Sequence, residues 1–104
     1  MRPLLAALSI VIALPSLCQA ADTVEVHIDN FTFVPATITV PKGGTVVWSN
    51  RDDMVHSVVA SDASFKSAPL DTDDRYSHTF TEAGEVTYFC GLHPQMIGHI
   101  VVKP

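Results

Sequence analysis

The sequence predicts an all-β fold, a β-sandwich of Greek-key type with about seven short strands. Two observations carry this prediction. Apolar and polar residues alternate in several short segments, as in Val24 to Ile28, and this alternation is typical of half-buried strands. Proline, glycine and aspartate turn signals separate these segments, and no stretch after residue 20 shows the period of an amphipathic helix.

Residues 1–20 have the features of a secretory signal peptide. Arg2 supplies a positive start, Leu4 to Leu14 form an apolar core that is too short to anchor the chain comfortably in a bilayer, and small residues precede a cleavage point after Ala20. We therefore expect export to the periplasm, no membrane anchor, and one mature domain that comprises residues 21–104.

The two cysteines have different fates in this prediction. Cys18 leaves with the signal peptide, and a lipoprotein role for it is disfavoured because Leu17, which is not a small residue, precedes it. Cys90 is then the only thiol of the mature domain, so no internal disulfide can form although the compartment is oxidising. A lone cysteine in an exported protein requires a reason, and ligation of a metal is the simplest one.

The strands expected in the mature domain follow one another with recognisable turns between them. Their approximate ranges are 24–28, 38–40, 45–50, 56–60, 75–81, 85–90 and 100–102. Pro41 to Gly44 is a turn by composition, because proline fixes φ and glycine permits positive φ. Residues 61–74 show no sustained period. We interpret the acidic run from Asp71 to Asp74 at their end as a solvated loop, and a docking role for this run is the alternative.

The segment from Tyr88 to Gly98, YFCGLHPQMIG, places three soft or borderline metal ligands close together, at Cys90, His93 and Met96. The apolar runs on both sides predict that these groups lie on a short loop between two strands. Loops held by a rigid sheet commonly carry binding chemistry. Cys-x2-His alone is a weak metal signal, and it becomes specific through the methionine three residues later and the strands around it.

His56, which opens a predicted strand, is the donor expected to complete the set. Two imidazoles and a thiolate in a plane, with a distant thioether, are the ligands of copper in electron-transfer sites. Zinc rarely takes methionine, and a structural zinc site would require a fourth cysteine or histidine. The predicted site therefore holds one copper ion through His56, Cys90, His93 and, weakly, Met96. Met54 is the competing axial ligand, but its irregular segment favours a place on the apolar rim of the site.

With these residues the chain resembles the cupredoxins, small blue copper proteins of the plastocyanin and amicyanin type. The spacing is closest to that of amicyanins, because plastocyanins have two more residues before the methionine, and the resemblance extends from about Val24 to Val102. It implies a cupredoxin-like sandwich, a single type 1 copper ion and electron transport, and it places Trp48 largely in the core.

The chain departs from the family pattern at Ser57, where plastocyanins and amicyanins have asparagine. A backbone N–H at this position could still reach the sulfur of Cys90. The serine side chain is shorter, however, and we expect this to affect the tie between the two ligand segments, the loop stability and the reduction potential.

The two histidines are expected to differ in exposure. His56 should be buried, whereas the ring edge of His93 should reach the surface and form the exit for the electron. The apolar residues expected to form a patch around that edge are Met54, Leu92, Pro94 and Ile97. Such a patch suits transient docking of redox partner proteins, and the resemblance implies the same.

Acidic groups number 11 and basic groups 6, and this excess argues against nucleic acid as a partner and favours the steering of protein partners. We expect a monomer that is not an enzyme. Two other functions would use the same residues. A periplasmic copper carrier or buffer would hand over the metal itself. An enzyme would use Cys90 as a nucleophile with His56 or His93 as its base, although the sequence has no oxyanion or substrate signature.

Overall fold

A computed structural model of the chain describes residues 22–104 and contains eight β-strands in two four-stranded sheets. The first sheet has the order β2-β1-β4-β6, with β1 at Thr23–Asp29, β2 at Thr32–Val34, β4 at Thr45–Asn50 and β6 at Arg75–Thr79. The second sheet has the order β3-β8-β7-β5, with β3 at Thr37–Pro41, β5 at Val59–Ala60, β7 at Gly84–Cys90 and β8 at His93–Lys103. The predicted all-β sandwich is confirmed, and its additional strand is the very short β2, which the alternation did not predict.

The predicted signal peptide lies outside the described residues. Within residues 22–104, no helix has the length and apolar character that crossing a membrane requires.

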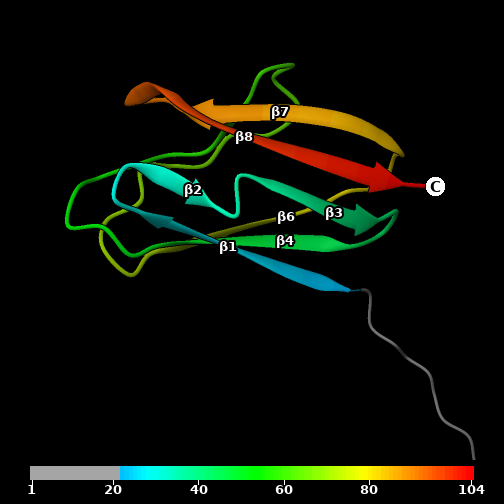
Figure 1. Cartoon of the computed structure of the whole chain (residues 1–104), viewed down its shortest axis with the longest axis horizontal. Coiled ribbons are helices and arrows are strands. Elements are labelled where there is room, and N and C mark those ends of the chain that lie inside the picture. Colours follow the sequence, from blue (N-terminus) through cyan, green and yellow to red (C-terminus); the bar gives the residue numbers. More distant parts are fainter. Residues whose placement is uncertain (1–21) are drawn as a thin grey trace, which may run out of the picture.

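Both sheets are mixed. Strand β1 lies parallel to β4 and β3 lies parallel to β8, while the other neighbouring pairs are antiparallel. Parallel neighbours cannot be joined by a tight turn, so the chain crosses between the sheets before it returns. These crossings bring connections from distant parts of the sequence to the same end of the sandwich. Figure 1 shows this end on the left, with the β1–β2 connection and the β7–β8 turn.

The core consists of the inward-facing side chains of both sheets, as the alternation predicts. Trp48 of β4 is fully buried and packs edge-on against Tyr88 of the opposite sheet, with ring centroids 5.3 Å apart. Tyr88 also covers Gly98 on β8 so closely that a Cβ there would lie 2.2 and 2.6 Å from two ring carbons and 2.4 Å from the hydroxyl oxygen. Burial raises the pKa of Tyr88 to about 12. Densely packed residues therefore support the strand that ends in Cys90.

Two predicted strands are shorter than expected. The strand expected at 56–60 is reduced to β5, and the strand expected at 75–81 ends at Thr79. His56 pairs instead with Leu70 in an isolated bridge, in which each backbone N–H donates to the other carbonyl at 3.1 and 2.7 Å. The cause is the segment 61–74, which folds back along residues 56–60 and takes up backbone hydrogen bonds that a sheet neighbour would otherwise make.

Candidate metal centre

Cys90 and His93 lie on either side of a two-residue turn. Cys90 is the last residue of β7 and His93 is the first of β8, and the two are already paired across the hairpin. The expected loop is therefore a tight turn, and Met96 lies within β8. A register shift between Phe89 and Cys90 interrupts the ladder here. Such irregularities re-aim side chains next to functional sites.

His56 reaches the same place from the segment that precedes β5. Its side chain is fully buried, whereas His93 is half-buried, in agreement with the predicted difference between the two histidines. The backbone of His56 is held by the two hydrogen bonds to Leu70. One imidazole is thus enclosed by the sandwich and the other lies at its surface.

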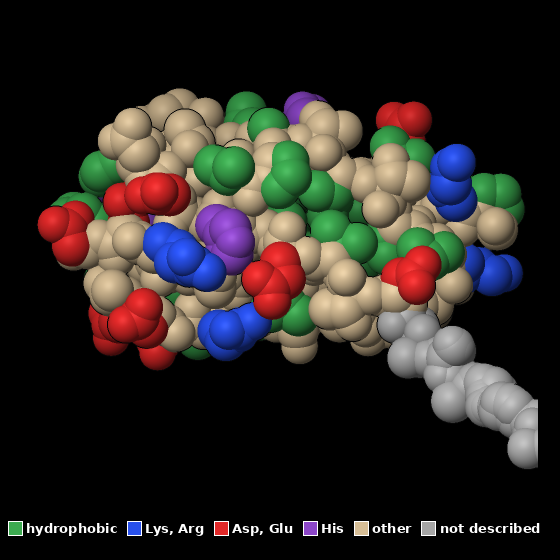
Figure 2. Space-filling view, turned by 60° about the horizontal axis from the view of Figure 1, so that its bottom comes forward, with side chains coloured by type: hydrophobic (Ala, Val, Ile, Leu, Met, Phe, Trp, Pro, Cys, Tyr) green, Lys and Arg blue, Asp and Glu red, His purple; other side chains and the backbone are tan. Residues whose placement is uncertain are grey.

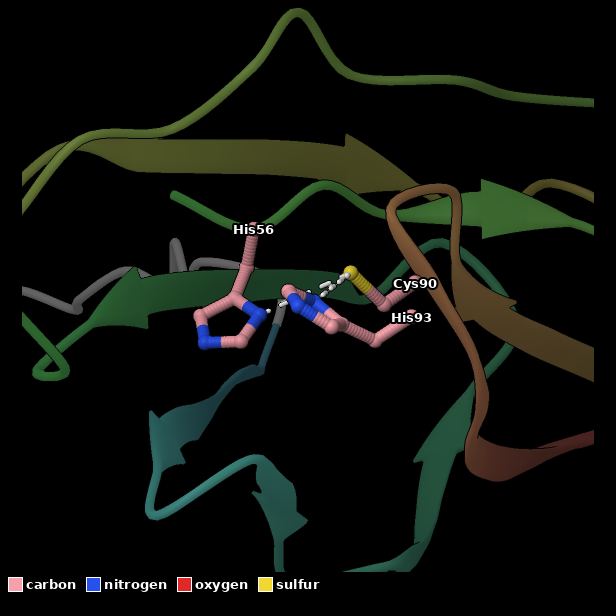
Figure 3. A group of neighbouring side chains, drawn as sticks. All are labelled: His56, Cys90 and His93. Carbon is pink, nitrogen blue, oxygen red and sulfur yellow. Dashed lines mark hydrogen bonds between the residues drawn. The ribbon is translucent and has the colours of Figure 1, made fainter. Parts of the chain in front are cut away.

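The structure brings His56, Cys90 and His93 together at the end of the sandwich (Figure 3). The Nδ1 atoms of His56 and His93 lie 3.6 and 3.8 Å from the sulfur of fully buried Cys90, and the potential ligand atoms of the three residues are all within 4.8 Å of one another. A metal with M–N bonds of about 2.0–2.1 Å and an M–S bond of about 2.3 Å would separate nitrogen from sulfur by roughly 3.6 Å at a tetrahedral angle and roughly 3.8 Å at a trigonal one. The donor set therefore fits a metal ion, and its two imidazoles and one thiol suit copper.

Ser57 ties the two ligand segments together with both its backbone and its side chain. Its N–H donates to the sulfur of Cys90 at 3.3 Å, and its hydroxyl oxygen accepts a hydrogen bond from the backbone N–H of Gly91 at 2.9 Å. The expected backbone contact is present, and the short side chain spans the gap as well. It does so because Gly91 has no Cβ: one built there would lie 2.8 Å from the Ser57 oxygen.

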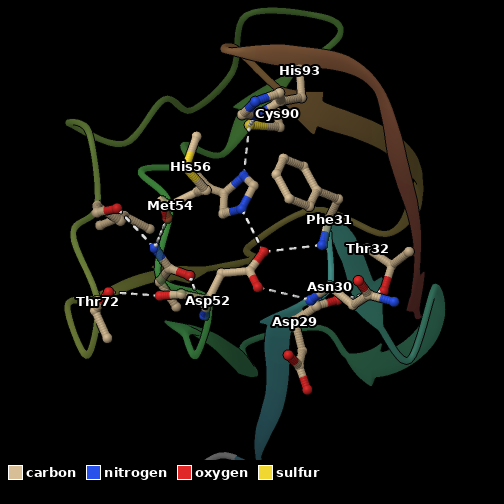
Figure 4. A network of polar contacts seen from close by, with 12 residues as sticks. Asp29, Asn30, Phe31, Thr32, Asp52, Met54, His56, Thr72, Cys90 and His93 are labelled. Atoms are coloured by element: carbon tan, nitrogen blue, oxygen red, sulfur yellow. Dashed lines mark hydrogen bonds and ion pairs between the residues drawn. The ribbon is translucent and has the colours of Figure 1, made fainter.

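Asp52 is a part of the site that the sequence analysis missed (Figure 4). One carboxylate oxygen lies 2.8 Å from Nε2 of His56, and the carboxylate also accepts hydrogen bonds from the backbone N–H groups of Asn30 and Phe31, each at 3.0 Å. The hydrogen bond from Phe31 is the main cause that lowers the pKa of Asp52; burial opposes this shift, and His56 and Asn30 add to it. A carboxylate four residues before a ligand histidine is common by chance, so the sequence contained no specific signal for this contact.

Phe31 is the second missed residue. Its ring lies edge-on to both imidazoles, with centroids 5.2 Å from His56 and 4.9 Å from His93 at interplanar angles of 87° and 85°. The backbone of Asn30 and Phe31 is in the left-handed region, with φ values of 52° and 61°. Asparagine tolerates this region, and a phenylalanine there is uncommon. The Asp29-Asn30 pair was the available signal for a turn that points an aromatic ring at the site.

The two methionines near the site differ strongly in burial. Met96 is 4% exposed, whereas Met54 is 47% exposed. The large apolar residues exposed in the described part of the chain are Phe31, Val34, Met54, Val55, Leu92 and Ile97. Several of them belong to the segments that carry or flank the three clustered ligands.

Comparisons with known proteins agree with this geometry. A family model described as the cupredoxin-like domain matches residues 3–102. Amicyanin of Paracoccus versutus is 34% identical over 88 aligned residues, with 80% of this chain and 67% of that protein covered. Chloroplastic plastocyanin of Tetradesmus obliquus is 33% identical over 84 aligned residues, with 68% and 58% covered. Among solved structures, a purple cupredoxin from Nitrosopumilus maritimus has a TM-score of 0.72 at 30% identity, covering 77% of this chain and 99% of that one.

Proposed function

The chain belongs to the cupredoxin-like domain family and takes a single type 1 copper ion as its cofactor, and from this we propose that it is a small periplasmic blue copper protein that carries single electrons between redox partner proteins. The observation that supports this most directly is the convergence of two Nδ1 atoms and one thiol sulfur from segments 34 residues apart. Export rests on the predicted signal peptide at residues 1–20. We further propose that the mature domain acts as a monomer.

In this proposal His56, Cys90 and His93 hold the copper, which supplies the one-electron couple. The backbone N–H of Ser57 donates to the sulfur of Cys90 at 3.3 Å and helps to hold that sulfur in place. Met96 is the weak axial ligand. Its burial, three residues after His93, supports this assignment, whereas the exposure of Met54 supports a place at the rim.

The electron would leave through the half-buried ring of His93. We propose that partners dock transiently on an apolar docking patch around it, made of Phe31, Met54, Leu92, Pro94 and Ile97. All five are exposed, and Phe31 directly contacts His93. A patch without extensive polar recognition favours brief contacts over a tight complex.

Charge at the same end of the molecule favours partners with a positive docking surface. Figure 2 shows acidic side chains gathered at its left end, which corresponds to the left end of Figure 1. Asp53, Asp71 and Asp73 are exposed, and the backbone N–H of Asp73 donates to the carbonyl of Asn50 at 2.7 Å, which holds this acidic turn beside the segment that leads to His56. Clustered charge of one sign raises the association rate with an oppositely charged partner.

The visible absorption spectrum of the copper(II)-loaded protein tests this function. We expect an intense thiolate-to-copper band in the red, which Cys90→Ser abolishes and the control Met54→Gln leaves intact. Met96→Gln should retain the band and lower the reduction potential, because an oxygen donor favours copper(II). A wild-type protein that stays colourless with cupric salt would contradict the proposal.

Kinetic measurements distinguish an electron-transfer function from a copper-delivery function. An electron carrier should exchange electrons rapidly between its two oxidation states and retain copper when a chelator is added. Rapid loss of copper to the chelator in both oxidation states, with slow electron exchange, would instead support a copper carrier. The nucleophilic-enzyme hypothesis receives no support from the geometry, because Cys90 is fully buried.

A further inference from the structure

We propose that Asp52 is the positioning residue of the site: its carboxylate orients His56 directly, and through the Asn30–Phe31 turn it also places an aromatic ring against His93. This inference rests on the proposed copper function and names how this chain keeps both imidazoles in place. The carboxylate makes three hydrogen bonds at 2.8–3.0 Å, one to the ring of His56 and two to successive backbone N–H groups. Asp52 is only 9% exposed.

The contact with His56 determines which ring nitrogen carries the proton. An ionised carboxylate can only accept hydrogen bonds, so Nε2 of His56 must donate to Asp52. The neutral imidazole then has its lone pair on Nδ1, the atom that lies 3.6 Å from the sulfur of Cys90. Asp52 therefore selects the tautomer that presents a free ligand nitrogen to the metal. The negative charge behind the ring also makes this nitrogen a stronger donor.

The second contact acts on the other imidazole. Two successive residues, Asn30 and Phe31, have left-handed backbone conformations, and their N–H groups both point at the Asp52 carboxylate. Successive N–H groups in such a turn form a concave anion-binding nest, here occupied by a side chain of the same protein. The carboxylate thus stabilises a conformation that the residues would otherwise disfavour. It fixes the point from which the Phe31 ring reaches His93, 4.9 Å away between centroids.

The backbone of Asp52 is anchored independently of its carboxylate. Its N–H donates to the side-chain oxygen of Asn50 at 2.9 Å, and its carbonyl accepts a hydrogen bond from the hydroxyl of Thr72 at 2.6 Å. The Asn50 side chain also donates to the carbonyls of Met54 and Leu70. A substitution that alters only the carboxylate therefore leaves the loop held by its other contacts (Figure 4).

Asp52→Asn tests the proposal, with Asp53→Asn as its matched control. Both variants remove one negative charge from the same loop, but Asp53 is exposed and makes none of these contacts. Loss of an outer partner of a metal ligand typically weakens metal binding about 10- to 100-fold, and we expect this loss of copper(II) affinity for Asp52→Asn. Each tenfold loss relative to copper(I) raises the reduction potential by about 59 mV. Asp53→Asn should stay within about twofold of wild type, because exposed charges interact weakly.

The effect of Asp52 on His56 can be distinguished from its effect on the Phe31 ring with the variant Phe31→Leu. Nitrogen NMR of the full chain without added copper gives the tautomer of His56. Wild type, Asp53→Asn and Phe31→Leu should all show His56 protonated at Nε2, and Asp52→Asn should show a mixture of tautomers. Phe31→Leu should accelerate loss of copper(I), because it removes the ring that covers half-buried His93. It should not change the His56 tautomer, because the contact between Asp52 and Nε2 of His56 remains. This design does not depend on Asp52→Asn folding, since the wild-type tautomer is itself decisive.

Protonation of wild-type His56 at Nδ1 would overturn the proposal. So would a copper(II) affinity of folded Asp52→Asn within about twofold of Asp53→Asn, given the loss expected for a functional outer partner. If wild type shows no red absorption band, the proposed function fails, and the tautomer measurement still decides how His56 is positioned. If wild type shows a normal band and Asp52→Asn binds copper(II) as tightly as Asp53→Asn does, only the role proposed for Asp52 fails.

Discussion

Gly91 and Ser57 form a matched pair, and their coupling can be predicted from the structure. A Cβ on Gly91 would lie 2.8 Å from the Ser57 hydroxyl oxygen and 3.3 Å from a methyl group of Val59. Gly91→Ala must therefore push the hydroxyl away and break the 2.9 Å hydrogen bond between the two residues. Ser57→Ala removes the same bond from the other side. Each single substitution loses this one hydrogen bond, and the double variant loses it only once.

The expected changes in the free energy of unfolding follow from the number of hydrogen bonds that each variant loses. Ser57→Ala should lower the free energy of unfolding by about 1 kcal/mol, the usual net contribution of one hydrogen bond. Gly91→Ala should cost about 1–2 kcal/mol, because it also crowds Val59, although it recovers roughly 0.4–1 kcal/mol by restricting the unfolded chain. In the Ser57→Ala background the hydroxyl is absent, so the added methyl group should cost less than about 0.5 kcal/mol. The predicted coupling energy is about 1 kcal/mol.

Urea unfolding of the copper-free chain measures this coupling, with the fluorescence of the single tryptophan, Trp48, as the signal. Ser67→Ala is the control: the Ser67 hydroxyl accepts a similar hydrogen bond from the N–H of Val58 at 2.9 Å but does not contact Gly91. Ser67→Ala and Gly91→Ala should be additive. If the Ser57 and Gly91 substitutions are also additive within about 0.3–0.5 kcal/mol, the close approach that we infer is wrong.

Three further predictions concern other parts of the domain. Gly98→Ala should lower the free energy of unfolding by about 2–3 kcal/mol, because its Cβ would overlap the buried Tyr88 ring; a urea midpoint close to wild type would contradict this. Burial lowers the pKa of His78 below its usual 6.5, so the unfolded state binds more protons around and below that pH, and stability should fall as pH drops from neutrality. His78→Gln should flatten that profile in thermal melts. Asp71→Asn with Asp73→Asn should slow oxidation by a cationic metal complex a few-fold at low salt, and Glu82→Gln, at the opposite end, should have little effect.

The fold could be predicted because most strands have one buried face. In β3 and β4, buried residues alternate with more exposed ones over several positions, and this is the signal that the sequence analysis used. The very short strand β2 offers too few positions for alternation to be recognised, and β5 keeps only two residues of the strand expected at 56–60. Their place depends on pairing with distant residues, as in the contact between Val59 and Phe89. Local patterns do not encode such pairings.

The site likewise has a part that the sequence could predict and a part that depends on the three-dimensional structure. The proximity of Cys90 and His93 could be predicted because they are close in sequence, and the approach of His56 to them was expected from the need for another imidazole. Asp52 and Phe31 depend on geometry that no local pattern specifies. Their contact exists only because a left-handed turn at the end of β1 meets the loop after β4, and these two parallel strands are joined through the second sheet.

The two histidines are held by different numbers of restraints, and this asymmetry predicts how each affects electron transfer. His56 is fully buried, its backbone is paired with Leu70, and its ring is bonded to Asp52. His93 is half-buried at a turn. Apart from His56 and Cys90, the residue that its ring contacts within the described part of the chain is Phe31. A geometric change between the two oxidation states of copper should therefore be taken up at His93, because fewer contacts oppose it there. Substitutions around His56 should chiefly change the reduction potential, and substitutions around His93 should chiefly change the self-exchange rate. Equal effects of Asp52→Asn and Phe31→Leu on both quantities would contradict this division.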